Sequence, residues 1–210
     1  MAFQLLDDLI IFPDTALADP DGLLAVGGDL SLERLHLAYQ IGIFPWYNEQ
    51  PILWFAPHER CVLSPQEIKI SKSMRKLLQA SVFEVRVNTA FEQVINCCAT
   101  TPRTGQVGTW ITEEMQKAYL NLHQAGLAHS VEVWQNNILV GGLYGIKINK
   151  VFCGESMFSH VSNASKAALI YLCKNLGFDL IDCQMPNEHL MSLGAKMISR
   201  DAYLHYLSSS

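Results

Sequence analysis

A single carboxylate stands in the segment Phe152–Ser159, which reads FCGESMFS and whose other side chains are apolar or small. Alternate side chains of a half-buried strand point toward water, so Glu155 could be an exposed acid on such a strand. Alternatively, Glu155 is a buried anion, which needs a partner or a substrate to offset its lost hydration. In the second case this carboxylate would have a task in the chemistry of the protein.

A second polar group lies in the apolar stretch Leu180–Gln184, which reads LIDCQ. On a regular strand, Asp182 and Gln184 point to one face and Cys183 to the other. Two polar side chains on one face of a central strand are costly unless they bond each other or a ligand. Spacing alone leaves a second interpretation open, in which Asp182 caps the loop that leads to Pro186.

The segment Ile70–Gln79 carries the densest basic cluster of the sequence. Lys72, Arg75 and Lys76 recur at the spacing of one helix face, and the apolar residues of the segment lie opposite. One interpretation is the solvated face of an amphipathic helix. The other is a surface that contacts the phosphate backbone of a nucleic acid without recognising its sequence. The net charge of −5 argues against bulk attraction to a polyanion, but a local patch can suffice.

Trp46 follows Pro45 in a turn, where an indole ring can stay partly open to a flat ligand. Stacking of a nucleobase on such a ring contributes about 1–3 kcal/mol and tolerates different bases. Packing in the core accounts for most other tryptophans.

Composition places these groups in a globular protein. Half of the 210 residues are hydrophobic and 17% are charged, which provides a sizeable core. The six cysteines form no CxxC pair and the seven histidines do not flank them at ligand spacing, so we expect reduced thiols and no metal. The start lacks a basic signal-peptide region, and no apolar run is long enough to span a bilayer. We expect a cytoplasmic protein.

Turn signals divide the chain. Residues 1–61 are rich in Pro, Gly and Asp turns and predict a small, loop-rich N-terminal domain with one clear helix, which begins at Ser31. Residues 62–210 predict a second domain of regular elements. We expect helices over 71–78, 90–99, 112–124, 165–176 and 187–193 and from 201, and strands over 83–88, 130–134, 138–148, 151–158, 179–184 and 196–199.

Two-residue turns at Asn136-Asn137 and Asn149-Lys150 predict hairpins that join the central strands into a meander. The helix after the meander is expected to be capped by Asn163 or Ser162 and ended by Gly177. A meander followed by helix–strand–helix–strand is the order of an acetyltransferase-like fold, which is an α+β (mixed α/β) sheet with flanking helices. Such folds bind an acyl donor where two strands splay apart. No Gly-rich turn follows the meander, which argues against acyl-CoA as the donor.

Several longer motifs carry a resemblance to a known family. They are Gly22–Leu30 (GLLAVGGDL), Gly42–Trp46 (GIFPW), Gly108–Ile111 (GTWI), Phe152–Ser159, Asn163–Lys166 (NASK), Ile181–Gln184 and Ser192–Ala195 (SLGA). In this order and over nearly the whole chain, they strongly resemble the bacterial leucyl/phenylalanyl-tRNA–protein transferases. The resemblance implies a small N-terminal domain and an acetyltransferase-like catalytic domain.

The resemblance also implies a reaction and its partners. Leu or Phe would pass from aminoacyl-tRNA to the α-amino group of proteins that begin with Arg or Lys, which marks them for N-degron proteolysis; transfer of Met is left open. The ester is already activated, so no cofactor or metal is expected. The alternatives are a CoA-dependent N-acyltransferase on the same fold and a non-enzymatic tRNA-binding adaptor.

Site roles follow from the same resemblance. Trp46 and Trp110 would hold the terminal adenosine of the tRNA. Lys72, Arg75 and Lys76 would grip its backbone. The pocket for the aminoacyl side chain would be formed by Leu143, Phe152, Met157 and Ile181. Leu143 stands where Met is frequent in the family, so the use of Met as a donor stays open.

We hypothesise that Asp182 orients Gln184 and polarises it toward the attacking amine, and that Glu155 holds the cationic acceptor. Gln is a poor base, so the proton acceptor stays open between water and a tRNA hydroxyl. The resemblance needs Phe152 and Met157 at one site, although a regular strand places them on opposite faces. A bulge or splay at Gly154 would reconcile the two requirements.

Overall fold

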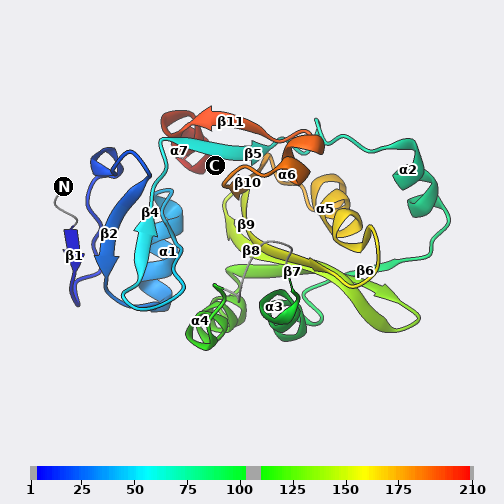
Figure 1. The fold of residues 1–210 in the computed structure, drawn as a ribbon, viewed down its shortest axis with the longest axis horizontal. Coiled ribbons are helices and arrows are strands. Elements are labelled where there is room, and N and C mark those ends of the chain that lie inside the picture. Colours follow the sequence, from blue (N-terminus) through cyan, green and yellow to red (C-terminus); the bar gives the residue numbers. More distant parts are fainter. Residues whose placement is uncertain (1–3, 103–109, 209–210) are drawn as a thin grey trace.

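Two β-sheets organise the chain in the computed structural model, which describes residues 4–102 and 110–208 (Figure 1). The first sheet has four strands in the order β1-β2-β4-β3. These strands are β1 (Gln4–Leu6), β2 (Leu23–Gly27), β3 (Phe44–Pro45) and β4 (Leu53–Phe55). The predicted helix of this region is present as α1 (Leu32–Gln40), and the hydroxyl of Ser31 accepts the backbone N–H of Arg34 at its start. A short 3-10 helix (Thr15–Leu17) precedes β2.

The second sheet has seven strands in the order β11-β5-β10-β9-β8-β7-β6. They are β5 (Glu59–Leu63), β6 (Glu84–Val87), β7 (Ala128–Gln135), β8 (Ile138–Ile148), β9 (Val151–Ser159), β10 (Leu180–Gln184) and β11 (Lys196–Ser199). Only β9 and β10 pair in parallel; the other neighbours are antiparallel. Every strand predicted after residue 61 is present. β5 was not predicted, because its residues were assigned to the boundary between the two regions.

Helices cover both faces of the second sheet. α3 (Phe91–Thr100) and α4 (Glu113–Gln124) pack on one face, and α5 (Ala164–Asn175) packs on the other (Figure 1). The remaining helices are α2 (Lys72–Gln79), α6 (Glu188–Ser192) and α7 (Arg200–Ser208). The predicted mixed sheet with flanking helices is therefore confirmed.

Two apolar clusters form the core. The first contains side chains of α3 and α4 together with Leu35 and Trp54 of the N-terminal region. The second lies under α5. The chain passes from the first sheet to the second between Phe55 and Glu59. The first apolar cluster contains residues from both sides of this point. The division at residues 61 and 62 remains a prediction about domain organisation.

Both predicted hairpins are present. Asn136 and Asn137 adopt positive φ values of 52° and 61°, as a tight two-residue turn between twisted strands requires. The predicted cap of the helix after the meander is wrong in detail. Asn163 precedes α5 with a positive φ of 70° and makes no side-chain cap; the hydroxyl of Ser159 accepts the backbone N–H of Ser165 instead.

Candidate active site

The parallel strands β9 and β10 part in the middle of the second sheet. Their pairing joins Val151–Cys153 to Leu180–Asp182 and does not continue beyond Cys153. At the same point the register between β8 and β9 shifts, because Tyr144 pairs with Ser156 and Gly145 pairs with Gly154. Glu155 is thus the extra residue of a β-bulge. The irregularity expected at Gly154 is confirmed.

The bulge changes which side chains share a face. Phe152 and Met157 lie five positions apart, and both pack with the second apolar cluster, whereas on a regular strand they would face opposite sides. Gly145 lies opposite the bulge, where a Cβ atom would come within 2.7 Å of the Phe152 ring. A residue without a side chain is therefore required at this position.

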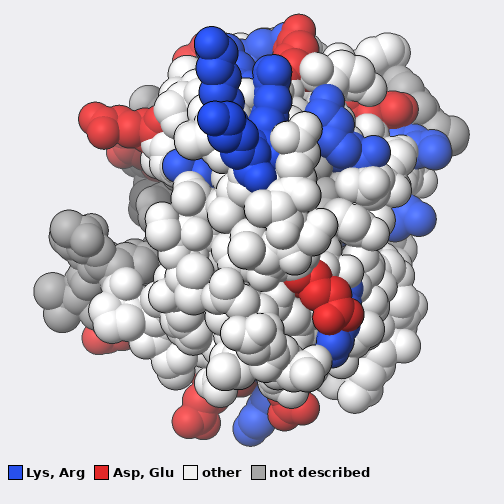
Figure 2. All heavy atoms as spheres, turned by 90° about the vertical axis from the view of Figure 1, so that its right-hand side faces the viewer, with Lys and Arg blue, Asp and Glu red and all other residues white. Residues whose placement is uncertain are grey.

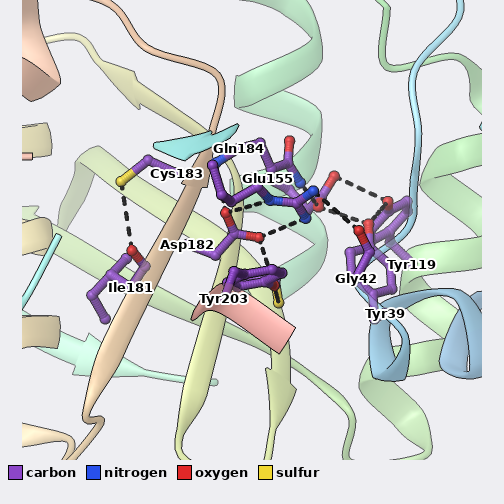
Figure 3. Close-up of polar contacts among 11 residues, drawn as sticks. Tyr39, Gly42, Tyr119, Glu155, Ile181, Asp182, Cys183, Gln184 and Tyr203 are labelled. Atoms are coloured by element: carbon purple, nitrogen blue, oxygen red, sulfur yellow. Dashed lines mark hydrogen bonds and ion pairs between the residues drawn. The ribbon is translucent and has the colours of Figure 1, made fainter. Parts of the chain in front are cut away.

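Glu155 is buried, with 8% of its surface exposed, and it accepts hydrogen bonds from three side chains (Figure 3). The hydroxyl of Tyr39 on α1 lies 2.7 Å from Oε1, and that of Tyr119 on α4 lies 3.0 Å from Oε2. The Nε2 group of Gln184 donates to Oε1 at 2.7 Å. Of the two interpretations of this carboxylate, the buried anion is the one observed.

Burial determines the protonation of this group. It raises the pKa of Glu155 to about 7, although the bonds from Tyr39, Tyr119 and Gln184 act in the opposite direction. Burial and the nearby Glu155 charge also raise the pKa values of Tyr39 and Tyr119 well above their ordinary value. Both tyrosines therefore remain protonated and can donate near neutral pH.

Asp182 is fully buried and makes a separate set of contacts. Its two oxygens accept hydrogen bonds from Nε and Nη2 of Arg60, each at 2.9 Å, and Oδ2 also accepts the hydroxyl of Tyr203. Oδ1 accepts the backbone N–H of Gln184 at 2.8 Å. The hypothesis that Asp182 polarises the Gln184 side chain needs correction on this point, because the contact is with the backbone and the side-chain amide turns to Glu155.

Arg60 is the cation that this buried anion requires, and no role was predicted for it. Its guanidinium lies 4.6 Å from the ring centres of both Phe44 and Tyr203 and donates to the carbonyl of Gly42. Burial lowers the pKa of Arg60, but the charge of Asp182 outweighs it, so the pKa is raised and the group stays cationic. A buried Asp without a designated cation is the signal that could have identified this arginine.

Three tyrosines of the site were also missed. Tyr39, Tyr119 and Tyr203 are each 1% exposed or less. In the sequence they stand at apolar positions of helices, where a tyrosine is most simply explained as part of the core. Nothing in the sequence distinguishes a hydroxyl that meets a carboxylate from one that meets the backbone.

A cavity of about 780 Å³ opens where β9 and β10 part, beside α5 and α6. Glu155 and Asp182 belong to its lining. So do all four side chains predicted for the aminoacyl pocket, namely Leu143, Phe152, Met157 and Ile181. The structure therefore brings the predicted apolar residues and the buried carboxylate to one place.

The two predicted adenosine-binding tryptophans do not line this cavity. Trp46 is 44% exposed and meets the edge of Phe55, whereas Trp110 is only 8% exposed. The segments that carry them are neighbours, since Gln50 donates to Glu114 at the start of α4. Gly108 and Thr109 of the GTWI motif lie outside the described residues.

The basic helix is present as predicted. On α2, Met74 is buried, whereas Lys72, Arg75 and Lys76 are exposed. Figure 2 views the side of the molecule that carries α2, and Lys and Arg side chains gather in its upper part.

Within the described residues, no group of three or more His, Cys, Asp or Glu side chains could hold a metal, and no helix could span a membrane.

Comparison with known proteins identifies the family. The sequence model described as leucyl/phenylalanyl-tRNA protein transferase matches residues 62–208, and that of the family's N-terminal domain matches residues 28–58. The chain belongs to this family. It is therefore an enzyme, a leucyl/phenylalanyl-tRNA–protein transferase, as the motifs of the sequence predict.

Individual relatives extend the match over nearly the whole chain. A leucyl/phenylalanyl-tRNA–protein transferase of Flavobacterium johnsoniae is 54% identical over 99% of this chain and 99% of its own length. That of Azotobacter vinelandii is 55% identical over 95% of this chain and 91% of its own length. Family membership favours the transferase over the two alternatives, a CoA-dependent acyltransferase and a tRNA-binding adaptor.

Among solved structures, FemX matches this transferase with a TM-score of 0.50 and 9% identity, over 85% of this chain and 71% of the other. A GCN5-related N-acetyltransferase from Kribbella flavida matches with a TM-score of 0.40 and 9% identity, over 77% and 58%. The likeness to FemX concerns the fold alone, and it agrees with the acetyltransferase-like sheet predicted from the sequence.

Proposed function

We propose that this transferase passes leucine or phenylalanine from tRNA to the α-amino group of cytoplasmic proteins that begin with Arg or Lys, and so marks them for degradation. The observation that carries this proposal is the cavity at the bulge. It joins the apolar side chains Leu143, Phe152 and Ile181 to the buried carboxylate of Glu155. The apolar side chains suit an apolar aminoacyl group, and the carboxylate suits a cationic amine.

The donor is bound in three places in this proposal. Its side chain enters the apolar cavity, its terminal adenosine contacts Trp46 and Trp110, and its backbone phosphates contact the basic face of α2. A closed apolar pocket excludes β-branched side chains by shape, but one methyl group changes binding by only about 1–3 kcal/mol. Discrimination of Leu, Phe and Met against Ile and Val is therefore incomplete.

The acceptor amine is placed by Glu155 and Gln184. Because Nε2 of Gln184 already donates to Glu155, the Gln184 side chain is fixed in direction. Its carbonyl oxygen has no hydrogen-bond partner among the described residues and can accept from the amine. Asp182 acts through the backbone of Gln184, whose φ of 59° it helps to hold. Catalysis then depends largely on orientation of the amine and the ester.

The test is a transfer assay with labelled leucyl-tRNA and a model protein that begins with Arg. The matched acceptor begins with Ala, and a second control adds ribonuclease. Label should appear only on the Arg protein and only with intact tRNA. Transfer from acetyl-CoA that ignores ribonuclease would support the acyltransferase alternative instead. Salt-sensitive tRNA binding without transfer would support the adaptor.

The roles of Asp182 and Gln184 are tested separately, with Asp182→Ala and Gln184→Ala at saturating aminoacyl-tRNA. Both variants should transfer more slowly than the wild type. Wild-type rates in both would show that neither residue positions the acceptor.

A further inference from the structure

Three side chains from distant parts of the chain, those of Tyr39, Tyr119 and Glu155, form a closed triangle of contacts. The hydroxyls of Tyr39 and Tyr119 lie 2.5 Å apart, and each also contacts the carboxyl group, at 2.7 Å and 3.0 Å (Figure 3). Tyr39 is on α1, Tyr119 on α4 and Glu155 on β9, so three separate elements meet here. All three residues are buried.

The number of hydrogens in this triangle depends on the charge of Glu155. Each contact needs one hydrogen, and each tyrosine supplies one. With an ionised carboxylate, the triangle has two hydrogens for three contacts. With a protonated carboxyl group it has three: Glu155 donates to Tyr119, Tyr119 to Tyr39, and Tyr39 back to Glu155. Each of the three contacts thus has its own hydrogen only when Glu155 holds a proton.

The ionised form is also supported, which allows the group to change state. Nε2 of Gln184 donates to Oε1 of Glu155, and this bond uses no hydrogen of the carboxyl group, so it is compatible with both states. Hydrogen bonds to a carboxylate are stronger than those to a neutral carboxyl group. The site therefore offers hydrogen bonds to either form of Glu155.

We propose that Glu155 is the proton acceptor of the transfer reaction and that the triangle with Tyr39 and Tyr119 holds the proton it receives. This inference rests on the proposed function, because it requires an α-ammonium group beside Glu155. It extends the predicted role of Glu155, which was only to hold the cationic acceptor.

An acceptor that arrives as an ammonium ion loses two protons when it becomes an amide. Glu155 removes the first proton and leaves a neutral amine. The amine nitrogen forms a bond to the ester carbonyl carbon, and the bond from that carbon to the ribose oxygen breaks. The second proton of the nitrogen passes to the leaving ribose oxygen. The products are an amide, a free tRNA hydroxyl and a protonated Glu155, which then releases its proton to solvent.

Groups on five elements determine this titration. Burial is the largest effect and, with the charge of Asp182 on β10, raises the pKa of Glu155 to about 7, against the opposing effect of donation from Tyr39, Tyr119 and Gln184. Arg60 on β5 is paired with Asp182 and offsets its charge. Cys153 on β9 is kept neutral by burial, which raises the pKa of its thiol. A base with a pKa near the working pH is well suited to proton transfer.

The decisive experiment compares the wild type with Glu155→Gln in single-turnover transfer from leucyl-tRNA to an Arg protein, between pH 6 and 9. Gln keeps the size and hydrogen bonding of the side chain but cannot take a proton. We expect the variant to be slower by about 10²–10⁴-fold near pH 7. Its deficit should shrink between pH 7 and 9, because an α-amine with a pKa of about 8 then arrives neutral.

A deficit that does not change with pH, or one confined to the KM for the acceptor, would overturn the proposal and leave Glu155 as a charge that binds the amine. If Glu155→Gln does not fold, the Tyr39→Phe variant tests the proposal. It removes a donor to the carboxylate, so the midpoint of the pH–rate profile should move upward, and an unmoved midpoint would contradict us. Failure of the wild type to transfer at all would instead reject the proposed function.

Discussion

Asp182 and Arg60 form a bidentate ion pair in the interior, with both N–O distances at 2.9 Å and neither residue more than 2% exposed. The pair links β10 to β5, and Tyr203 on the last helix completes it. The pair is close to the bulge that carries Glu155, because Asp182 pairs in the sheet with Cys153, two residues before Glu155 on β9. The predicted catalytic aspartate is therefore also a structural residue.

Removal of one member of this pair should be severely destabilising. Arg60→Ala leaves the Asp182 charge buried without its cation, and the free energy of unfolding should fall by about 3–5 kcal/mol. Urea denaturation measures the change. Arg86→Ala is the matched control, because Arg86 also pairs with an acid, Glu84, but on the surface. An Arg60→Ala variant as stable as the control would show that the pair does not stabilise the fold.

The stability of the protein should depend on the charge state of Glu155. Its pKa is raised to about 7 in the folded state and is near 4.5 when unfolded, so the folded state binds more protons between these values. This contribution is complete below pH 4.5 and is lost as pH rises through 7. It corresponds to about 3 kcal/mol. The difference in unfolding free energy between the wild type and Glu155→Gln, measured by denaturant at pH 5 and pH 8, should fall with pH. A constant difference would contradict the raised pKa.

Much of this architecture could be predicted from the sequence, because it depends on local signals. The Asn-containing turns determine the hairpins, and period-2 patterns identify the strands of the meander. β5 was missed because its short apolar run follows a turn-rich segment and lacks alternation. The bulge was foreseen only because Phe152 and Met157 had to share a site. The partners of Glu155 and Asp182 could not be predicted, since Tyr39, Arg60 and Tyr203 come from elements that meet only in the folded chain.

The apolar cavity should determine which amino acid is transferred. Leu143→Ala removes a side chain that lines the cavity, so the larger phenylalanyl group should gain relative to leucyl. We expect the ratio of kcat/KM for Phe over Leu to rise by about 10-fold, which corresponds to about 1.4 kcal/mol. Ile146→Ala is the control, because Ile146 lies on the same strand and packs in the first apolar cluster, away from the cavity. An equal change in both variants would argue against the pocket.

The exposed face of α2 should contribute electrostatic affinity for tRNA without affecting the fold. Each of Lys72→Ala, Arg75→Ala and Lys76→Ala should weaken tRNA binding and reduce the slope of log K against log salt by about 1. Filter binding at several salt concentrations measures this slope. Lys117→Ala on α4 is a matched exposed control. Slopes that match the control in all three variants would show that α2 does not contact the tRNA.

The polar network around the bulge has a consequence for synthesis of the protein. It draws on Tyr39 from the first helix and Tyr203 from the last, together with Arg60 and Asp182 between them. A nascent chain that still lacks α7 leaves the Arg60–Asp182 pair without one of its ligands. Translation must therefore proceed past Tyr203 before the whole network around Asp182 can assemble.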